Sequence, residues 1–161
     1  MSTIFSRQCE YALQATMYLA LKPPGEMTTI KELTTQLPIP YHFLGKILQD
    51  LAHKGLVRSL KGPAGGFALA ASPEELTPFM IIEAIDGTEF THSCIMGFDH
   101  CDKDHPCSLH EPWSVCRDIF QKSLTTKSIR EMAEEMHKPE YLHEQGAEFP
   151  LKSEETKGEY V

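Results

Sequence analysis

The chain has 161 residues, 41% of them hydrophobic, and a formal net charge of −8. This length accommodates one globular unit or a small domain with an added dimerisation element. No stretch approaches the ~18 apolar residues of a membrane-spanning helix, and the first residues lack the pattern of a secretory signal. We therefore expect a cytoplasmic protein with no membrane partner, in which clustered cysteines are more often metal ligands or redox sensors than disulfides.

The negative charge is concentrated in the second part of the chain. Residues 1–71 contain seven Lys and Arg against four Asp and Glu, a net charge of +3, whereas residues 72–161 contain eight against nineteen, a net charge of −11. Proteins that bind DNA usually present a basic face to the phosphates. The overall acidity therefore does not exclude DNA binding by the first part.

Three helices are predicted before residue 55. Residues 5–21 place apolar side chains at helical spacing, with Ser6 as the N-cap. A second helix over residues 29–37 follows Thr28 and stops at a proline, and a third covers residues 41–54, with a glycine after it as the C-cap. Two short helices joined by a tight turn are typical of a helix-turn-helix.

A β-hairpin is predicted directly behind the third helix. Residues 56–60 have the composition of a strand, the glycine-rich residues 61–66 that of a turn, and residues 67–70 that of a returning strand. A hairpin in this position is a wing. The first 71 residues therefore predict a winged helix-turn-helix.

The second part of the chain is predicted to be helical apart from one loop. Ser72 and Pro73 are expected to cap a further helix, with a second start near Pro78. Pro112 is expected to open an amphipathic helix over residues 113–124, and Thr126 to cap a last one. The fold class is thus mainly α with a small β-hairpin wing, a winged helix-turn-helix plus a long dimerisation helix. The predicted division is a DNA-binding domain 1–71, a linking helix 72–87, a cysteine-rich cluster-binding loop 88–110, a dimerisation helix and following helix 111–137, and a disordered acidic tail 138–161.

Three cysteines and a histidine lie within seventeen residues of this loop, as Cys94, Cys101, Cys107 and His110. Thiolates and imidazole are ligands of iron in iron–sulfur clusters and equally of zinc. The residues alone therefore leave both metals open. A nucleophilic Cys107–His110 pair is not supported, because nothing in the sequence orients the histidine. With no other catalytic pattern, we interpret the chain as a non-enzyme.

The candidate DNA-contacting residues come from three places in the first part of the chain. Side chains at the start of a recognition helix reach base edges in the major groove, those on a wing reach phosphates or the minor groove, and helix starts can meet phosphates. In that order, the candidates are Tyr41, His42 and Lys46, then Arg58 and Lys61, then Arg7 and Thr28. The expected partner is double-stranded DNA.

Several segments carry a resemblance to a known family. SRQCEYALQATMYLA, GPAGGFALA, IIEAIDG and the three-cysteine loop resemble the Rrf2 family of bacterial winged-helix regulators, over about residues 3–137. The resemblance implies a homodimeric transcription factor that binds an operator, with the helix after the cysteine loop crossing its counterpart. Trp113 on that helix is interpreted as a dimer anchor.

The resemblance also bears on the metal. It favours an iron–sulfur cluster over zinc, and [2Fe-2S] over [4Fe-4S], held by the three cysteines. The family usually separates the first two cysteines by five residues, whereas six residues separate Cys94 from Cys101. For the fourth ligand, one branch of the family implies His110, another implies Glu10 of the partner subunit, and Cys9 is a third candidate.

The sequence therefore predicts a transcriptional repressor that senses iron–sulfur, redox or nitric-oxide status through a cluster in the 94–110 loop. Two alternatives stay open. The first is a zinc-stabilised winged-helix interaction module. The second is a metal-free thiol-switch regulator in which Cys101 and Cys107 form a reversible disulfide.

Overall fold

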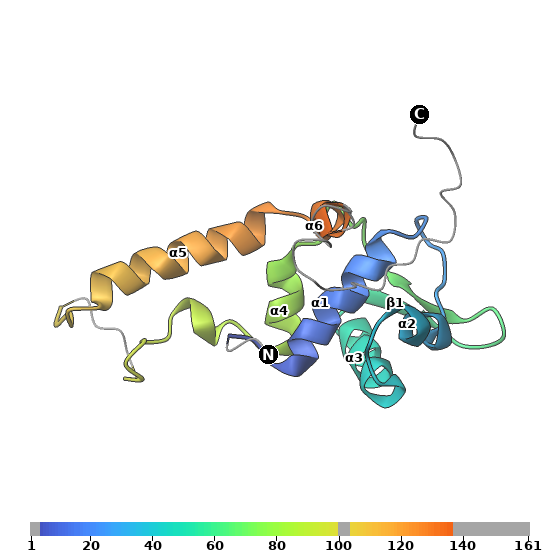
Figure 1. Ribbon diagram of the computed structural model, residues 1–161, viewed down its shortest axis with the longest axis horizontal. Helices are drawn as coiled ribbons and strands as arrows, with labels where there is room; N and C mark the ends of the chain where they lie inside the picture. The colour runs from blue at the N-terminus through green and yellow to red at the C-terminus, as the bar shows by residue number, and fades with distance from the viewer. Residues whose placement is uncertain (1–3, 100–103, 137–161) are drawn as a thin grey trace.

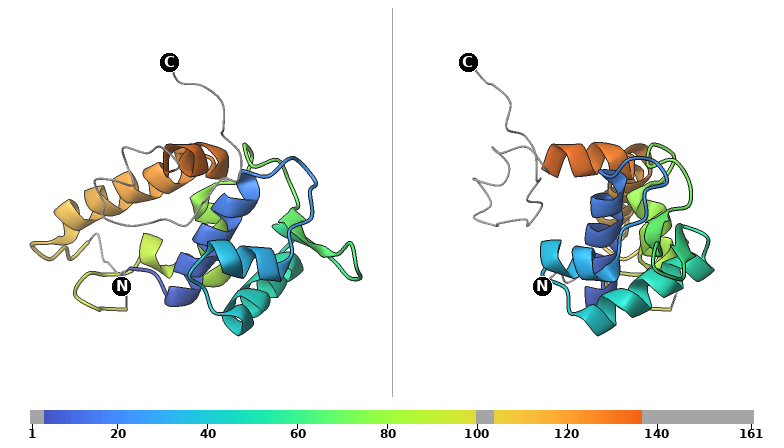
Figure 2. Two further views of the ribbon diagram at one scale, coloured as in Figure 1. Left: turned by 45° about the vertical axis from the view of Figure 1, so that its right-hand side comes forward. Right: turned by 90° about the vertical axis from the view of Figure 1, so that its right-hand side faces the viewer.

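The computed structural model describes residues 4–99 and 104–136. Figure 1 shows the first three helices and the hairpin gathered in one body, with the fourth helix beside the first and the fifth extending away, and the views of Figure 2 agree. This confirms the predicted mainly helical fold with a two-stranded antiparallel hairpin. The elements in chain order are α1 (Arg7–Ala20), α2 (Ile30–Gln36), α3 (Tyr41–His53), β1 (Val57–Leu60), β2 (Gly66–Leu69), α4 (Pro78–Ile85), the 3-10 helix η1 (Glu89–Thr91), α5 (His110–Thr126) and α6 (Ile129–Met136).

The ends of the first three helices follow from local capping. The Ser6 hydroxyl accepts a hydrogen bond from the Cys9 amide at 3.1 Å, which confirms the predicted start of α1. The Thr29 hydroxyl accepts from the Glu32 amide at the start of α2, also at 3.1 Å. α3 ends before Gly55, whose φ of +76° is a conformation that glycine adopts without strain.

The core lies where α3 packs against α1 and the hairpin. The apolar positions of α3 recur at helical spacing and face inward, while α1 contributes small residues that allow close approach. Burial of these side chains supplies the main drive for folding. Fully buried apolar residues of this core include Ala12, Ala15, Leu33, Leu44, Leu48, Leu51, Ile81, Ile82 and Ile129.

The wing is attached to the connection between α1 and α2. β1 and β2 pair with Arg58 opposite Ala68, and Thr28 adds an isolated bridge to Phe67, with both backbone N–H groups donating, at 2.9 and 2.8 Å. The chains approach so closely that a Cβ at Gly66 would lie 2.5 Å from the Thr28 carbonyl oxygen. Only glycine fits there, and the hairpin is held in one position relative to the helix-turn-helix.

The helix start predicted at Ser72 is wrong, whereas the second start predicted near Pro78 is confirmed. Residues 73–75 form a turn, closed by the Glu75 amide donating to the Ser72 carbonyl at 2.9 Å. α4 begins only at Pro78, with the Thr77 hydroxyl accepting from the Met80 amide. A proline suits the first position of a helix but biases the preceding residue away from helical backbone, so the helix cannot continue upstream through Thr77.

The boundaries of the last two helices also differ from expectation. α5 starts at His110, before Pro112, and runs through Thr126. α6 is capped by Ser128, whose hydroxyl accepts from the Glu131 amide at 3.1 Å while the Glu131 carboxylate accepts from the Ser128 amide at 2.7 Å. This reciprocal capping box satisfies two otherwise free backbone donors, which explains why the cap is at Ser128 and not at Thr126.

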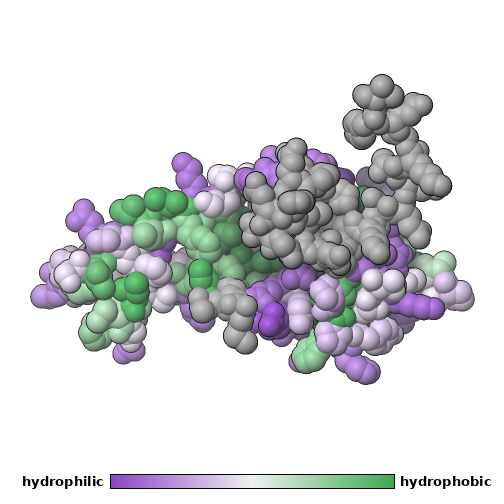
Figure 3. All heavy atoms as spheres, viewed as in Figure 1, coloured by the Kyte–Doolittle hydropathy of each residue, from purple (hydrophilic) through white to green (hydrophobic). Residues whose placement is uncertain are grey.

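α5 has no buried residue although it is 17 residues long. Its apolar side chains Val115 and Ile119 are 51% and 62% exposed, and Figure 3 shows apolar surface gathered at the end of the molecule formed by α5 and the cysteine-rich residues. An apolar stripe of this kind usually marks an interaction surface. None of the helices within the described residues is long and apolar enough to span a bilayer. The predicted tail, 138–161, lies outside the described residues.

Candidate functional site

One face of α3 is free of the core and carries aromatic and basic side chains. The helical period that buries Leu44 and Ile47 leaves Tyr41, Phe43 and Lys46 exposed. His42 is exposed beside them. The three residues predicted for the recognition helix thus lie on a surface that a major groove can reach.

Phe43 was not predicted to be part of this face, although it is 63% exposed. The signal was present in the sequence, since the period that assigns Leu44 and Ile47 to the core assigns Phe43 to the outside. An exposed aromatic ring in a major groove can contact a thymine methyl group. Phe43 therefore joins the candidate DNA-contacting residues.

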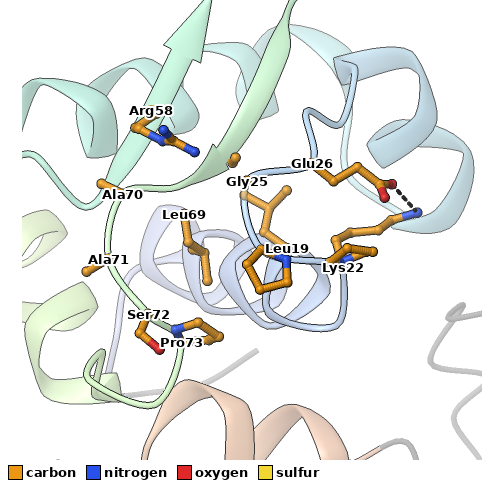
Figure 4. A pocket seen from close by; sticks show the side chains of 13 residues that line it. Leu19, Lys22, Gly25, Glu26, Arg58, Leu69, Ala70, Ala71, Ser72 and Pro73 are labelled. Atoms are coloured by element: carbon orange, nitrogen blue, oxygen red, sulfur yellow. Dashed lines mark ion pairs between the residues drawn. The ribbon is translucent and has the colours of Figure 1, made fainter.

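The wing carries two exposed cations, Arg58 and Lys61. Arg58 lines a pocket of about 340 Å³ between the wing and the α1–α2 connection, and Figure 4 shows its side chain directed toward Gly25. A Cβ on Gly25 would lie 3.5 Å from Arg58 Nη2. No ion pair is found for Arg58, Lys61 or Lys46 among the described residues, which leaves their charges available to phosphates.

The structure does not support the predicted phosphate contact of Thr28. Its side chain is fully buried, and its hydroxyl has no hydrogen-bond partner within residues 4–99 and 104–136. The reason is the bridge to Phe67, which turns Thr28 into part of the wing and leaves the N-cap of α2 to Thr29. We remove Thr28 from the candidate DNA-contacting residues.

Arg7 lies apart from the other cations. Its guanidinium pairs with Glu10 at 3.1 Å and lies over the Tyr11 ring, 5.8 Å from the centroid. The neighbouring Gln8 donates to Asp50, near the end of α3, about 13 Å along the helix from Tyr41. A phosphate contact by Arg7 would therefore belong to another part of the DNA than the contacts of the recognition face.

The cysteine segment, which we define as residues 88–109, consists of η1 followed by turns, bends and irregular backbone in its described parts, residues 88–99 and 104–109. Cys94 is half-buried and Cys107 is exposed. The Gly97 amide donates to the Cys94 carbonyl, and the His110 amide donates to the Cys107 carbonyl, each at 3.0 Å. Cys107 and His110 are thus brought together at the start of α5.

Cys101 lies outside the described residues, so the structure places three of the four predicted ligands. Within residues 4–99 and 104–136, no three Cys, His, Asp or Glu side chains converge as a metal site. The donor set itself, thiols with an adjacent imidazole, suits iron–sulfur clusters and zinc. The assignment of Cys94, Cys101, Cys107 and His110 as ligands stays a prediction.

α5 is hydrogen-bonded to the cysteine segment through two side chains. Trp113 Nε1–H donates to the Ser93 carbonyl at 2.9 Å, and Arg117 Nη1 donates to the same oxygen at 3.1 Å. The Nε–H of Arg117 is buried and has no acceptor among the described residues. Trp113, interpreted from the sequence as a dimer anchor, therefore also contacts the residue before Cys94.

Four phenylalanines connect the cysteine segment to the rest of the fold. The Phe90 ring of η1 lies 5.5 Å from Phe5, 6.0 Å from Phe120 of α5 and 6.2 Å from Phe79 of α4, measured between ring centroids. Next to Phe5, the amide of Ser6 donates to Asp86 at the end of α4 at 2.7 Å. The start of α1 is thereby held between α4 and the cysteine segment.

The two alternative fourth ligands lie on α1 in contrasting surroundings. Cys9 is fully buried, and burial together with the nearby Asp86 and Glu10 carboxylates raises the pKa of its thiol to about 12. Metal ligation requires the thiolate, so the geometry disfavours Cys9. Glu10 is partly exposed and pairs with Arg7, and its carboxylate is therefore more accessible than the Cys9 thiol.

Cys9 should resist alkylation in the folded, metal-free protein. At pH 8, a thiol of pKa ~12 is ionised on the order of a thousandfold less than an ordinary one, and its side chain is also inaccessible. Iodoacetamide labelling followed by peptide mass spectrometry should modify exposed Cys107 and leave Cys9 unmodified until the chain is denatured. Labelling of Cys9 within tenfold of the Cys107 rate would contradict its burial.

The sequence matches the model of the Rrf2 family, described as iron-dependent transcriptional regulators, over residues 5–135. The chain is 32% identical over 118 residues to the HTH-type transcriptional regulator NsrR of Halalkalibacterium halodurans, which covers 72% of this chain and 75% of that protein. It is 26% identical over 122 residues to the regulator IscR of Pectobacterium carotovorum, with 76% and 74% covered.

The fold is similar to that of CymR, the global cysteine regulator of B. subtilis. The TM-score is 0.72 at 24% identity, over 84% of this chain and 98% of CymR. This likeness supports the winged-helix fold, and the family match extends over nearly all of the described residues. Members of the family are transcriptional regulators and not enzymes. The chain belongs to the Rrf2 family of transcriptional regulators.

Proposed function

We propose that the protein is a cytoplasmic, homodimeric repressor that binds an operator through two winged helices and senses iron–sulfur, redox or nitric-oxide status through its cysteine segment. The observation that carries the proposal is the contact of this segment with both α5 and the start of α1. A change in the segment can therefore act on the dimer helix and on the DNA-binding domain together.

The proposed DNA contacts follow from the exposed face of α3 and from the wing. Tyr41, His42, Phe43 and Lys46 would enter the major groove, where sequence is read at base edges. Arg58 and Lys61 would meet the backbone on either side, where contacts position the protein and carry most of the salt dependence.

The proposed homodimer rests on α5. A helix of 17 residues with no buried side chain gains little from the fold of its own chain, and its exposed Val115 and Ile119 supply apolar surface for a second copy. Two copies related by a two-fold axis would present two recognition helices to a palindromic operator.

The proposed cofactor is an iron–sulfur cluster, [2Fe-2S] in preference to [4Fe-4S], ligated by Cys94, Cys101 and Cys107 with His110, or Glu10 of the partner subunit, as the fourth ligand. The residues fit such a group, because the orphaned Arg117 Nε–H beside the segment suits an anionic thiolate-rich centre. When bound, the cluster supplies a centre whose gain, loss or oxidation responds to the signal. Zinc is the alternative metal.

A route from the segment to the recognition helix runs along α1. Phe90 contacts Phe5 at its start, and Gln8 donates to Asp50 of α3 at 3.1 Å. Ordering or release of the cysteine segment can thus bias the placement of α3, which is the kind of two-state element that a switch requires.

A metal-free thiol switch is the second candidate, and the exposure of Cys107 favours it. An exposed thiol is open to oxidation, and a disulfide with Cys101 would change the same segment. The two candidates differ in whether the reduced protein contains a metal cluster or only free cysteine thiols.

Metal analysis of anaerobically purified protein tests the proposal. We expect visible absorbance with about two iron and two sulfide ions per chain. Stoichiometric zinc in a colourless protein would contradict it and support a zinc-stabilised module. A protein without metal that forms a Cys101–Cys107 disulfide under mild oxidation, seen by mass spectrometry, would instead support the thiol switch.

A further inference from the structure

The carbonyl of Ser93 receives two side-chain donors from α5. Trp113 Nε1 lies 2.9 Å away and Arg117 Nη1 lies 3.1 Å away. The two residues are four apart, so they share one face of the helix. Ser93 directly precedes Cys94. Its carbonyl oxygen accepts from two side chains that lie 20 and 24 residues later in the chain, and these two hydrogen bonds fix its position.

We infer that Arg117 is a positioning residue of the cysteine segment, which sets the backbone at Cys94 and neutralises negative charge there. The effect of Arg117 on metal rests on the proposed function, whereas its effect on the backbone at Cys94 is independent of that function.

The Arg117 guanidinium has the charge and the hydrogen-bond donors that this role requires. A hydrogen bond with a charged donor is stronger than a neutral one, and Arg117 keeps a second donor, Nε–H, buried and without an acceptor among the described residues. A buried donor left unpaired is costly. The cost would be smaller if an acceptor became available in a functional state, and a cluster ligated by Cys94 would supply sulfur acceptors of negative charge.

The two hydrogen bonds to the Ser93 carbonyl would stabilise the backbone turn that follows it. Cys94 is followed by a turn in which the Gly97 amide donates to the Cys94 carbonyl at 3.0 Å, with φ of +75° at Gly97. Ser93 lies directly before this turn, between the end of η1 at Thr91 and the start of α5 at His110. Its amide donates to the Glu89 carbonyl of η1 at 2.8 Å, and its carbonyl accepts from Trp113 and Arg117, so the two side chains of α5 add to the anchoring of the residue before the turn.

Hydrogen exchange of the full-length, metal-free protein tests the inference directly. Arg117→Gln should speed amide exchange in the peptide that contains Gly97 by about tenfold, the effect of losing one charge-assisted hydrogen bond while Trp113 still donates. The exchange rate of Arg117→Lys should lie between the rates of Arg117→Gln and the wild type. Lys122→Gln is the matched control, since it removes one exposed positive charge from the same helix and should leave the exchange unchanged.

A second measurement tests whether Arg117 also affects metal retention. In anaerobically purified protein, Arg117→Gln should release iron to excess EDTA about tenfold faster than wild type or Lys122→Gln, at an unchanged thermal unfolding midpoint of the metal-free chain. The factor is in the range usual for groups that orient metal ligands. If Arg117→Gln unfolds at a lower temperature but each folded chain releases iron at the wild-type rate, the role of Arg117 is merely structural and the inference is overturned.

The two measurements separate this inference from the proposed function. Unchanged exchange at Gly97 in Arg117→Gln overturns the positioning role whether or not the protein binds metal. Faster exchange in the variant of a chain that binds no metal upholds the positioning role while the proposed iron–sulfur function fails. Faster exchange with equal iron release would confine Arg117 to the backbone and overturn its part in metal retention.

Discussion

Cys107→Ala should abolish the visible absorbance of anaerobically purified protein and reduce bound iron to near zero. The replacement removes one of the three proposed thiolate ligands, and neither a water nor the adjacent His110 would restore the charge and softness that iron–sulfur clusters require. Absorbance spectra together with iron and sulfide counts per chain measure the effect. The side chain is exposed, so the replacement should leave the fold intact, which circular dichroism checks.

Cys116→Ala is the matched control for this experiment. Cys116 is also a free, exposed cysteine, but it lies on α5, outside the predicted ligand set. We expect it to retain the absorbance and iron of the wild type. Equal loss in both variants would show that the loss does not depend on a ligand role of Cys107, and equal retention in both would rule out Cys107 as a ligand.

Lys46→Ala combined with Arg58→Ala should weaken operator binding by at least a hundredfold at low salt. The dimer would lose roughly four phosphate or base contacts, each worth on the order of 1 kcal/mol, and the slope of log K against log salt should become shallower by about three to four. Fluorescence anisotropy over a salt series, with a duplex selected from a random library by the wild type, measures both quantities.

The control removes the same charge from the other end of the molecule. Lys122→Ala with Lys127→Ala takes two positive charges from the α5–α6 region, where the Lys127–Glu135 ion pair is exposed and contributes little to stability. This variant should bind the operator with a salt slope like that of the wild type. If both double variants lose affinity equally, net charge and not the α3–wing surface governs binding.

Most of the winged helix could be predicted because its signals are local. The apolar period over residues 41–54 and the flanking proline and glycine define α3 almost to the residue. The glycine-rich turn likewise defines the hairpin. In each case the local preference and the tertiary packing agree, which is the usual condition for a correct prediction.

Capping residues were predicted less well because polar residues recur near helix ends. Thr126 and Ser128 both fit a helix start, and the capping box with Glu131 selects Ser128. Thr28 and Thr29 are adjacent candidates, and the pairing of Thr28 with Phe67 selects Thr29. A residue 39 positions away in the chain decides the second case, and no local pattern contains that information.

By itself, the sequence determined the winged helix-turn-helix, its wing and the predicted ligand set, since these depend on periodicity, turn residues and the chemistry of cysteine. The tertiary structure decided which side chains surround that set. It buried Cys9 and raised the pKa of its thiol, and it brought Trp113 and Arg117 to Ser93. Burial and long-range hydrogen bonds depend on how α5, α4 and α1 pack, and packing joins residues whose separation in the chain carries no periodic signal.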